Sequence, residues 1–341
     1  MGVNLTPIIV KRVVELEFLR GRSIAIDAFI ELHQFLALIR TRDGKPLMDE
    51  MGRVTSHLVG LAFRTTRLIS DYSIRPVFVF DGEPPLLKRA ELEKRRELRM
   101  KAEEEYATAL EAADYSTAFS KAVMTGKLTN ERIDDSKRLL KLLGIPMVQA
   151  PSEGEAQASH MARRGSVWAV GSRDYDSLLF GAPRLVRYIT IQGEEYLPSK
   201  GIARKLKPEF IDLDVFLRNY GINRDQLIDL SILIGTDFNE GIRGVGPKTA
   251  LKLIKEHGRL EDLPESMAAK LPSNYDEVRN LYLNPEVTDD YDIQPDSLDE
   301  EGLYAFLCDA HSFSRSRVDV IVERMRSFYG KRTLESWFKE D

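Results

Sequence analysis

Seven carboxylates stand out because they follow short apolar segments or border glycine-rich turns. They are Asp27, Asp81, Glu153, Glu155, Asp174, Asp176 and Asp237. Oxygen ligands of this kind, with only five scattered histidines in the chain, suit Mg²⁺ or Mn²⁺ better than zinc. Two ionised carboxylates 4 Å apart repel by roughly 4 kcal/mol at an effective dielectric of 20, so several in one crevice need cations. If these acids converge, a divalent-metal site is the expected result.

Each acid also has a purely structural alternative. An aspartate after a strand is often a turn or helix-cap residue, and Ser152-x-x-Glu155 is typical of a capping box. For one acid alone we favour the structural role. The number of acids in comparable positions reverses that preference.

A glycine-rich segment, Gly235–Leu251, is the second chemical signal. Its turn and the helix start that follows are formed by Gly241, Gly244, Gly246, Pro247, Lys248 and Thr249. Proline suits the first helical position, and free backbone N–H groups at a helix start bind a phosphate whatever the base. The pattern predicts a helix-hairpin-helix over residues 223–258 that grips a DNA backbone; a plain helix-turn-helix linkage is the alternative.

A basic segment follows Asp81 closely. Between Lys88 and Lys101 there are seven basic and three acidic residues. Lys88, Arg95 and Arg99 fall near one helix face, because seven residues make about two turns. The interleaved glutamates favour a solvated charged face, but the position after a predicted strand end favours contact with a metal-bound phosphate.

Three apolar segments are expected to position the acids. Ser23–Asp27, Pro76–Asp81 and Val167–Val170 are typical of parallel strands covered on both faces. Amphipathic stretches at 55–70 and 134–143 alternate with them. The pattern predicts an α/β fold, a doubly wound, mostly parallel sheet flanked by helices, whose strand ends bring the acids into one crevice.

Composition narrows the class of protein. The 341 residues are 43% hydrophobic, the single cysteine, Cys308, excludes an intrachain disulfide, and no apolar run approaches the ~20 residues that span a bilayer. We expect a soluble, cytoplasmic protein. The net charge of -5 argues weakly against a nucleic-acid partner, but local clusters of charge carry more weight than the sum. The start also fits a myristoylation pattern through Gly2, without a polybasic segment to support it.

These motifs together resemble the flap endonuclease family of structure-specific 5′ nucleases, in its compact archaeal form. The most specific blocks are Ile26–Ala28, Val79–Pro85, Ala150–Ala156, Asp174–Asp176 and Gly235–Leu251. The resemblance implies cleavage of 5′ flaps at single-strand/duplex DNA junctions by two-metal-ion hydrolysis. It also implies 5′–3′ exonuclease activity and a place in Okazaki fragment maturation and DNA repair.

The resemblance also implies roles for individual residues. The seven acids would hold two Mg²⁺, which Mn²⁺ could replace, and Lys88 and Arg95 would contact the scissile phosphate. Carbonyls of Gly241, Ile242 and Val245 would bind K⁺. Contacts to DNA would come from Gly2, His33, Arg99, Gly244, Gly246, Lys248 and Thr249. His33 stands where the family commonly has an aromatic residue that stacks on a base.

By the same resemblance, residues 1–330 would be a single nuclease domain. Its parts would be an N-terminal region 1–98, a helical gateway and cap 83–133, an internal region 134–258 and C-terminal helices 303–329. The tail 331–341 resembles a sliding-clamp binding peptide with Leu334, Trp337 and Phe338 as apolar anchors, although Lys331 replaces the usual glutamine. A tail that packs on its own domain is the alternative. We expect a monomer associated with the nucleoid.

Two other functions compete. A non-catalytic junction-binding adaptor recruited to the clamp would have an incomplete acid set, and no member is missing here. A small-molecule phosphohydrolase with an aspartate nucleophile is supported only by Asp174-x-Asp176, and it leaves the glycine-rich turn and the basic segment without a role.

Overall fold

The computed structural model describes residues 2–41, 45–112, 117, 121, 126–190, 193–197 and 202–337. Within these, only the backbone is described for residues 110–111, 193–197, 202–205 and 331–337. Part of the predicted cap and Phe338 lie outside the described residues.

A seven-stranded mixed sheet forms the centre of the molecule, in the order β1-β9-β6-β5-β2-β3-β4. The strands are β1 (Arg12–Val13), β2 (Ser23–Asp27), β3 (Arg75–Phe80), β4 (Met147–Gln149), β5 (Ala169–Gly171), β6 (Arg184–Arg187) and β9 (Glu209–Asp212). The five strands from β6 to β4 are parallel, while β9 and β1 run antiparallel at one edge. The predicted doubly wound, mostly parallel sheet is confirmed.

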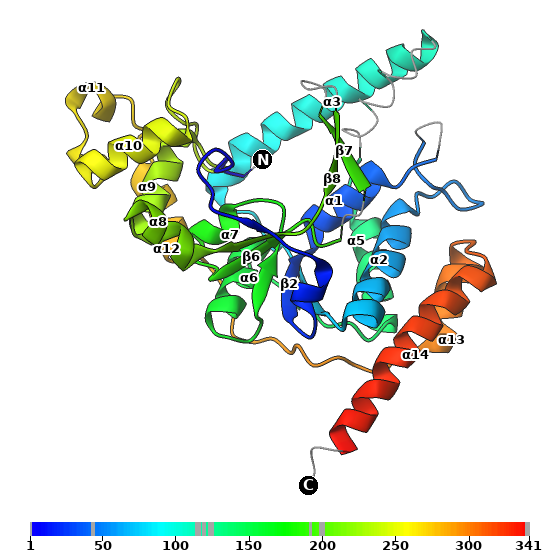
Figure 1. Ribbon diagram of the computed structural model, residues 1–341. Helices are drawn as coiled ribbons and strands as arrows, with labels where there is room; N and C mark the ends of the chain where they lie inside the picture. The colour runs from blue at the N-terminus through cyan, green and yellow to red at the C-terminus, as the bar shows by residue number, and fades with distance from the viewer. Residues whose placement is uncertain are drawn as a thin grey trace.

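Both faces of the sheet are buried, because alternate strand residues enter different cores. Ala25 and Val77 belong to one apolar cluster, whereas Ile24, Ile26 and Phe78 belong to the other. The first cluster packs under α6 (Gly154–Arg163), α7 (Asp176–Leu179), α8 (Leu213–Tyr220), α9 (Arg224–Ile234), α10 (Pro247–His257) and α12 (Tyr275–Leu283). The second packs under α1 (Ala28–Leu38), α2 (Ser56–Tyr72), α5 (Asn130–Leu142), α13 (Glu300–Tyr304), a π-helix (Ala305–Ala310) and α14 (Arg315–Trp337). Figure 1 shows the two groups on opposite sides of the sheet.

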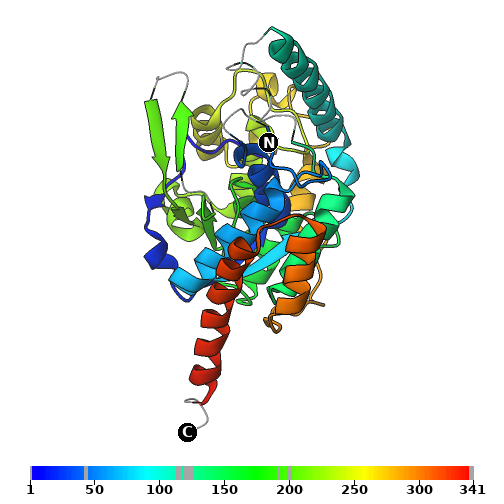
Figure 2. The ribbon, with the colours of Figure 1, turned by 90° about the vertical axis from the view of Figure 1, so that its right-hand side faces the viewer.

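One long helix projects from this body. A short 3₁₀ turn (Leu86–Lys88) leads into α3 (Arg89–Glu111), which extends away from the sheet in both views (Figures 1 and 2). It makes up most of the described part of the predicted gateway and cap, 83–133, whose last residues, from Asn130, belong to α5. A separate two-stranded ribbon, β7 (Gly193–Leu197) and β8 (Ile202–Leu206), was not predicted.

The observed element boundaries agree closely with the predicted ones at the strands and less well at the C-terminus. β2 has the expected limits, and α9 and α10 fill the predicted region 223–258. The last helix was expected to end at Tyr329 but continues to Trp337, because no proline follows Tyr329 and the single glycine, Gly330, weakens a helix without ending it. Among the described residues, the remaining helices are two 3₁₀ turns (Leu16–Leu19 and Leu260–Asp262) and α11 (Glu265–Ala268). Among the described helices, none combines the length and apolarity needed to cross a bilayer.

Candidate functional site

The seven acids lie at the carboxyl edge of the parallel strands. Asp27 ends β2, and Asp81 directly follows β3. The others stand at element starts or in the segment after α9: Glu153 and Glu155 at α6, Asp174 and Asp176 at α7, and Asp237 beyond Ile234. Five separate parts of the chain therefore supply carboxylates to one region.

Mutual effects on pKa show that these acids are neighbours. Burial, and then the charge of Asp81, raise the pKa of Asp27 well above its usual value. Burial and the charge of Asp176 do the same to Glu155. The pKa of Asp176 rises to about 7, through burial and the charge of Asp237. Ionised carboxylates in such a place need positive charge to balance them.

Hydrogen bonds fix the orientation of several of these carboxylates. Asp27 Oδ1 accepts from the N–H of Ile30 at 2.9 Å and so caps α1. Asp27 therefore has the helix-capping role that was the structural alternative for such an acid. Asp81 Oδ1 accepts from the N–H of Gly154 at 2.7 Å. Glu155 Oε1 accepts from Ser172 Oγ at 2.7 Å and from Ser177 Oγ at 2.9 Å.

The capping-box alternative for Glu155 is wrong. The N-cap of α6 is Glu153, which makes no side-chain cap bond, and Ser152 Oγ donates instead to the carbonyl of Glu83 at 3.0 Å. Glu155 is therefore free of a capping role and turns toward the serines beneath the other acids.

Two glycines let the backbone approach the carboxylates closely. A Cβ built on Gly154 would lie 2.5 Å from Asp81 Oδ1, and one on Gly2 would overlap the carboxylate of Asp176. The next residue, Val3, donates its N–H to Asp176 Oδ1 at 2.7 Å. Gly2, predicted to lie near DNA, is thus placed directly beside the acids.

Lys88 and Arg95 form ion pairs with two of the acids. Lys88 Nζ donates to Glu153 Oε2 and lies 4.0 Å from Asp237 Oδ2. Arg95 Nη2 donates to Asp237 Oδ2 at 2.5 Å. Burial alone would raise the pKa of Asp237, but the charges of Arg95 and Lys88 lower it below its usual value. The root of α3 therefore lies over the acidic crevice.

Arg99 and His33 lie further along the same side. Arg99 is half-buried on α3, and the exposed side chain of His33 on α1 is within electrostatic range of Arg99 and Arg95.

The seven carboxylates are suitable ligands for a hard cation, although they do not surround one common point. All seven side chains offer oxygen, several are buried beside like charges, and glycines leave room around Asp81 and Asp176. Within the described residues, however, no three acidic, histidine or cysteine side chains are close enough to hold one ion. Lys88 and Arg95 occupy oxygens of Glu153 and Asp237.

The segment between α9 and α10 makes a tight turn. Gly244 has φ +85°, and a Cβ on Gly241 would overlap the backbone of Ile234. Val245 donates its N–H to the carbonyl of Ile242 at 2.9 Å. Gly246 is the N-cap of α10 without a side-chain cap, and Lys248 and Thr249 are exposed in the first turn. The N–H groups at this helix start remain open to an anion.

Comparisons with known proteins agree with this geometry. Models of the XPG N-terminal domain and the XPG I-region match residues 1–102 and 144–237. Flap endonuclease 1 of Thermococcus onnurineus is 48% identical, with 99% of each chain aligned, and that of Pyrococcus furiosus is 48% identical over 99% of this chain and 100% of its own. This chain belongs to the flap endonuclease 1 family. It is a structure-specific flap endonuclease, a nuclease that hydrolyses phosphodiester bonds.

Solved structures place the flap endonuclease fold over almost the whole chain. Flap endonuclease-1 from Methanococcus jannaschii aligns with a TM-score of 0.77 and 38% identity, over 97% of this chain and 100% of that one. The catalytic core of Rad2, in complex with a DNA substrate, aligns with a TM-score of 0.68 and 25% identity, over 92% of this chain and 96% of its own.

Three contacts around the endonuclease's acids were missed by sequence reasoning. They are the Val3 N–H on Asp176, the serines beneath Glu155, and the hydroxyl of Tyr282, which donates to Asp176 Oδ2 at 3.5 Å. Ser172, two residues before Asp174, and Ser177, directly after Asp176, could have been found from the sequence. Val3 and Tyr282 come from remote segments.

The predicted clamp-binding anchors lie at the far end of α14. The helix backbone carries Leu334 and Trp337 away from the body (Figures 1 and 2), but their side chains, and all of Phe338, lie outside the described residues. Their role stays a prediction.

Proposed function

We propose that this flap endonuclease cuts one phosphodiester near the junction of a 5′ single-stranded flap and duplex DNA, with two divalent cations held by the seven acids. The carrying observation is that acids from five chain segments share one edge of the sheet with Lys88 and Arg95. Mg²⁺ is the expected metal and Mn²⁺ a substitute, because every donor is an oxygen. When bound, such ions supply an activated water and charge neutralisation at the leaving oxygen.

The chain's own cations act on the phosphate. Lys88 and Arg95 are held at the crevice by Glu153 and Asp237, and a bound phosphodiester offers them competing oxygens. Their charges then stabilise the extra negative charge of the transition state. The acids outnumber them, so without metal the crevice repels the DNA backbone.

Docking of duplex DNA is assigned to the turn between α9 and α10. The open N–H groups after Gly246, with Lys248 and Thr249, suit backbone phosphates. We assign K⁺ to the carbonyls of Gly241, Ile242 and Val245. DNA in the Rad2 complex supports the substrate class. Specificity would come from shape, because α3 and the remaining cap admit only an unpaired strand, past Arg99 and His33.

We assign the C-terminal residues Leu334, Trp337 and Phe338 to a sliding clamp. A monomer tethered in this way would work in replication and repair at the nucleoid. The terminal helix supports this role, because its backbone extends away from the body (Figure 2).

Three labelled DNAs test the proposal: a 5′ flap, a nicked duplex and a blunt duplex, each incubated with the full chain and Mg²⁺. We expect cleavage of the flap at its junction, weaker exonuclease products from the nick, and none after addition of EDTA. Flap binding without cleavage would instead identify an adaptor. Hydrolysis of p-nitrophenyl phosphate without DNA cleavage would identify a small-molecule phosphohydrolase.

A further inference from the structure

The amino edge of the sheet, opposite the acids, carries an aromatic and arginine surface. Trp168 precedes β5 and stacks on Phe210 of β9, with ring centroids 5.6 Å apart and planes at 17°. Phe18, in the 3₁₀ turn Leu16–Leu19, meets both rings edge-on and is 39% exposed. Phe210 is buried, whereas Phe18 and Trp168 remain partly open to solvent.

Arginines surround these rings. The guanidinium of Arg22 lies 5.0 Å from the Trp168 ring centroid and that of Arg184 5.4 Å. Arg12 lies 5.2 Å from Phe18 and 5.0 Å from Phe210. Among the described residues, Arg12, Arg22 and Arg184 form no ion pair. Arg184 Nη1 donates to the carbonyl of Trp168 at 3.3 Å. The remaining N–H groups of a guanidinium stacked on a ring can still meet a carboxylate.

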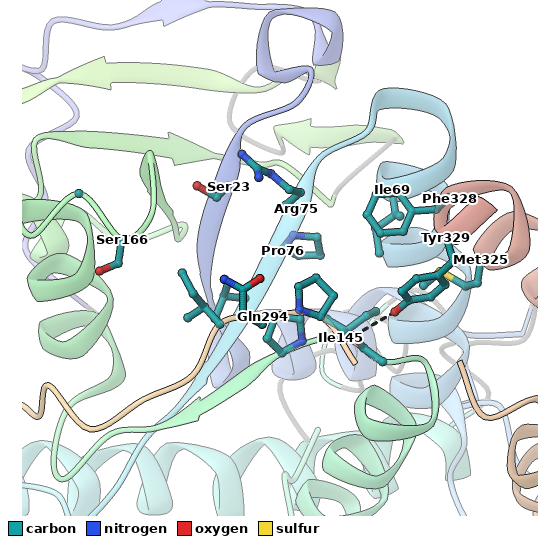
Figure 3. A pocket seen from close by; sticks show the side chains of 16 residues that line it. Ser23, Ile69, Arg75, Pro76, Ile145, Ser166, Gln294, Met325, Phe328 and Tyr329 are labelled. Carbon is teal, nitrogen blue, oxygen red and sulfur yellow. Dashed lines mark hydrogen bonds between the residues drawn. The ribbon is translucent and has the colours of Figure 1, made fainter. Parts of the chain in front are cut away.

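The surface continues to the place where α14 leaves the body. Arg75, the first residue of β3, donates through Nη2 to the carbonyl of Gly21 at 3.2 Å, beside Arg22. Ser23 and Arg75 share a pocket of about 350 Å³ with Phe328 and Tyr329 of α14 (Figure 3). Tyr329 donates to the carbonyl of Gly144 at 3.0 Å, just before β4. The tail therefore begins at the same edge as the arginines.

We propose that this edge, defined by Arg12, Arg22, Arg75 and Arg184 around Phe18 and Trp168, is a second docking surface for the protein that holds the C-terminal tail, through a carboxylate-rich face of that protein. The inference rests on the proposed binding of the tail to a sliding clamp. Glu15 and Glu17 are exposed acids beside this surface, and Glu15 is paired with Lys207.

Geometry favours a protein partner over DNA at this edge. Strand β2 runs from Ser23, at this edge, to Asp27, at the acids. Its four steps of about 3.3 Å place the two surfaces about 13 Å apart, facing in opposite directions. DNA held at the acids leaves this edge free. A partner bound to the tail is held close to this edge. A weak second contact with the same partner then strengthens the overall binding, although the affinity of the tail itself is unchanged.

The test measures the affinity of the full chain for a recombinant clamp ring, at low and moderate salt. The variants are Arg22→Glu alone, Arg22→Glu with Arg184→Glu, and Arg218→Glu, an exposed control on α8. We expect the double variant to bind about tenfold more weakly and with less salt dependence, Arg22→Glu alone to fall between, and the control to stay within twofold of the unchanged chain. Flap cleavage without clamp should be the same for all of them.

A tail variant, Leu334→Ala with Trp337→Ala, separates the two proposals. Unchanged clamp binding by this variant would refute clamp recruitment itself. Loss of binding by the tail variant, with full binding by both arginine variants, would refute the second surface alone. The second surface is also refuted if the arginine variants lose affinity for flap DNA in the absence of the clamp. The same holds if light scattering shows that the unchanged chain is a dimer and that the variants are monomers.

Discussion

Arg95 on α3 and Asp237 beyond α9 are joined by a hydrogen bond of 2.5 Å between Nη2 and Oδ2. The bond ties the projecting helix to the segment that leads into the glycine-rich turn. Arg95 Nε also donates to Glu91 Oε1 at 2.9 Å, so the guanidinium is held from two sides. A cation placed in this way is oriented before the substrate arrives.

Arg95→Ala should slow single-turnover flap cleavage by about 100-fold while changing flap affinity less than threefold. Removal of one positioned charge from a transition state costs about that much in rate. Lys94→Ala is the matched control, because Lys94 is exposed and lies 4.0 Å from Glu240 only. Equal losses of rate and affinity in Arg95→Ala would assign the helix to simple docking.

Asp174→Asn should abolish cleavage and leave flap binding nearly intact. The substitution keeps the shape of the side chain but removes a charge from the proposed cation site. Quenched-flow cleavage and fluorescence anisotropy would measure the two effects, with Asp214→Asn on α8 as an exposed control. Full activity of Asp174→Asn would show that this acid is no essential ligand.

Gly154→Ala should lower cleavage by at least tenfold, because the added Cβ would lie 2.5 Å from Asp81 Oδ1 and push that carboxylate from its place. Gly330→Ala, where nothing lies within 4 Å of the added Cβ, should leave activity unchanged and stabilise α14 by about 1 kcal/mol. Single-turnover rates and thermal unfolding of both variants test this. Normal cleavage by Gly154→Ala would contradict the close approach at Asp81.

The free energy of unfolding should depend on pH through Glu31, which is not one of the seven acids of the site. It is buried, accepts a hydrogen bond from Thr190 Oγ1, and burial raises its pKa from 4.5 to about 7. The folded chain thus holds a proton that the unfolded chain releases above 4.5, so stability falls as the pH rises from about 4.5 to 7. The loss is at most about 3 kcal/mol.

Glu31→Gln removes this ionisation but keeps an acceptor for Thr190. The variant should therefore gain stability relative to the unchanged chain between pH 5 and pH 8, as measured by urea unfolding at both values. Glu301→Gln, at an exposed position, should show no such change. A constant difference between Glu31→Gln and the unchanged chain at both values would mean that Glu31 does not titrate there.

The sheet and the positions of the acids were predictable because both depend on local patterns. β2 has the predicted limits, since an apolar run that ends at Asp27 marks its own boundary. The predicted capping box at Ser152 was wrong, because Glu153 is the N-cap of α6 and Ser152 instead donates to the carbonyl of Glu83, a remote residue.

The supporting contacts were not predictable from the sequence. Val3 and Asp176 are 173 positions apart, and Tyr282 and Asp176 are 106 apart. No periodicity or spacing links such segments, because only the completed packing of α12 and the N-terminal residues brings them to Asp176. The end of α14 was also missed, since Gly330 weakens a helix without stopping it.

The parallel strands give the molecule a front and a back. Asp27 and Asp81 lie at the front, where the strands end, whereas Ser23 and Arg75 lie at the back, beside the root of the terminal helix. A partner bound at the back would therefore leave Asp27, Asp81 and the other acids uncovered.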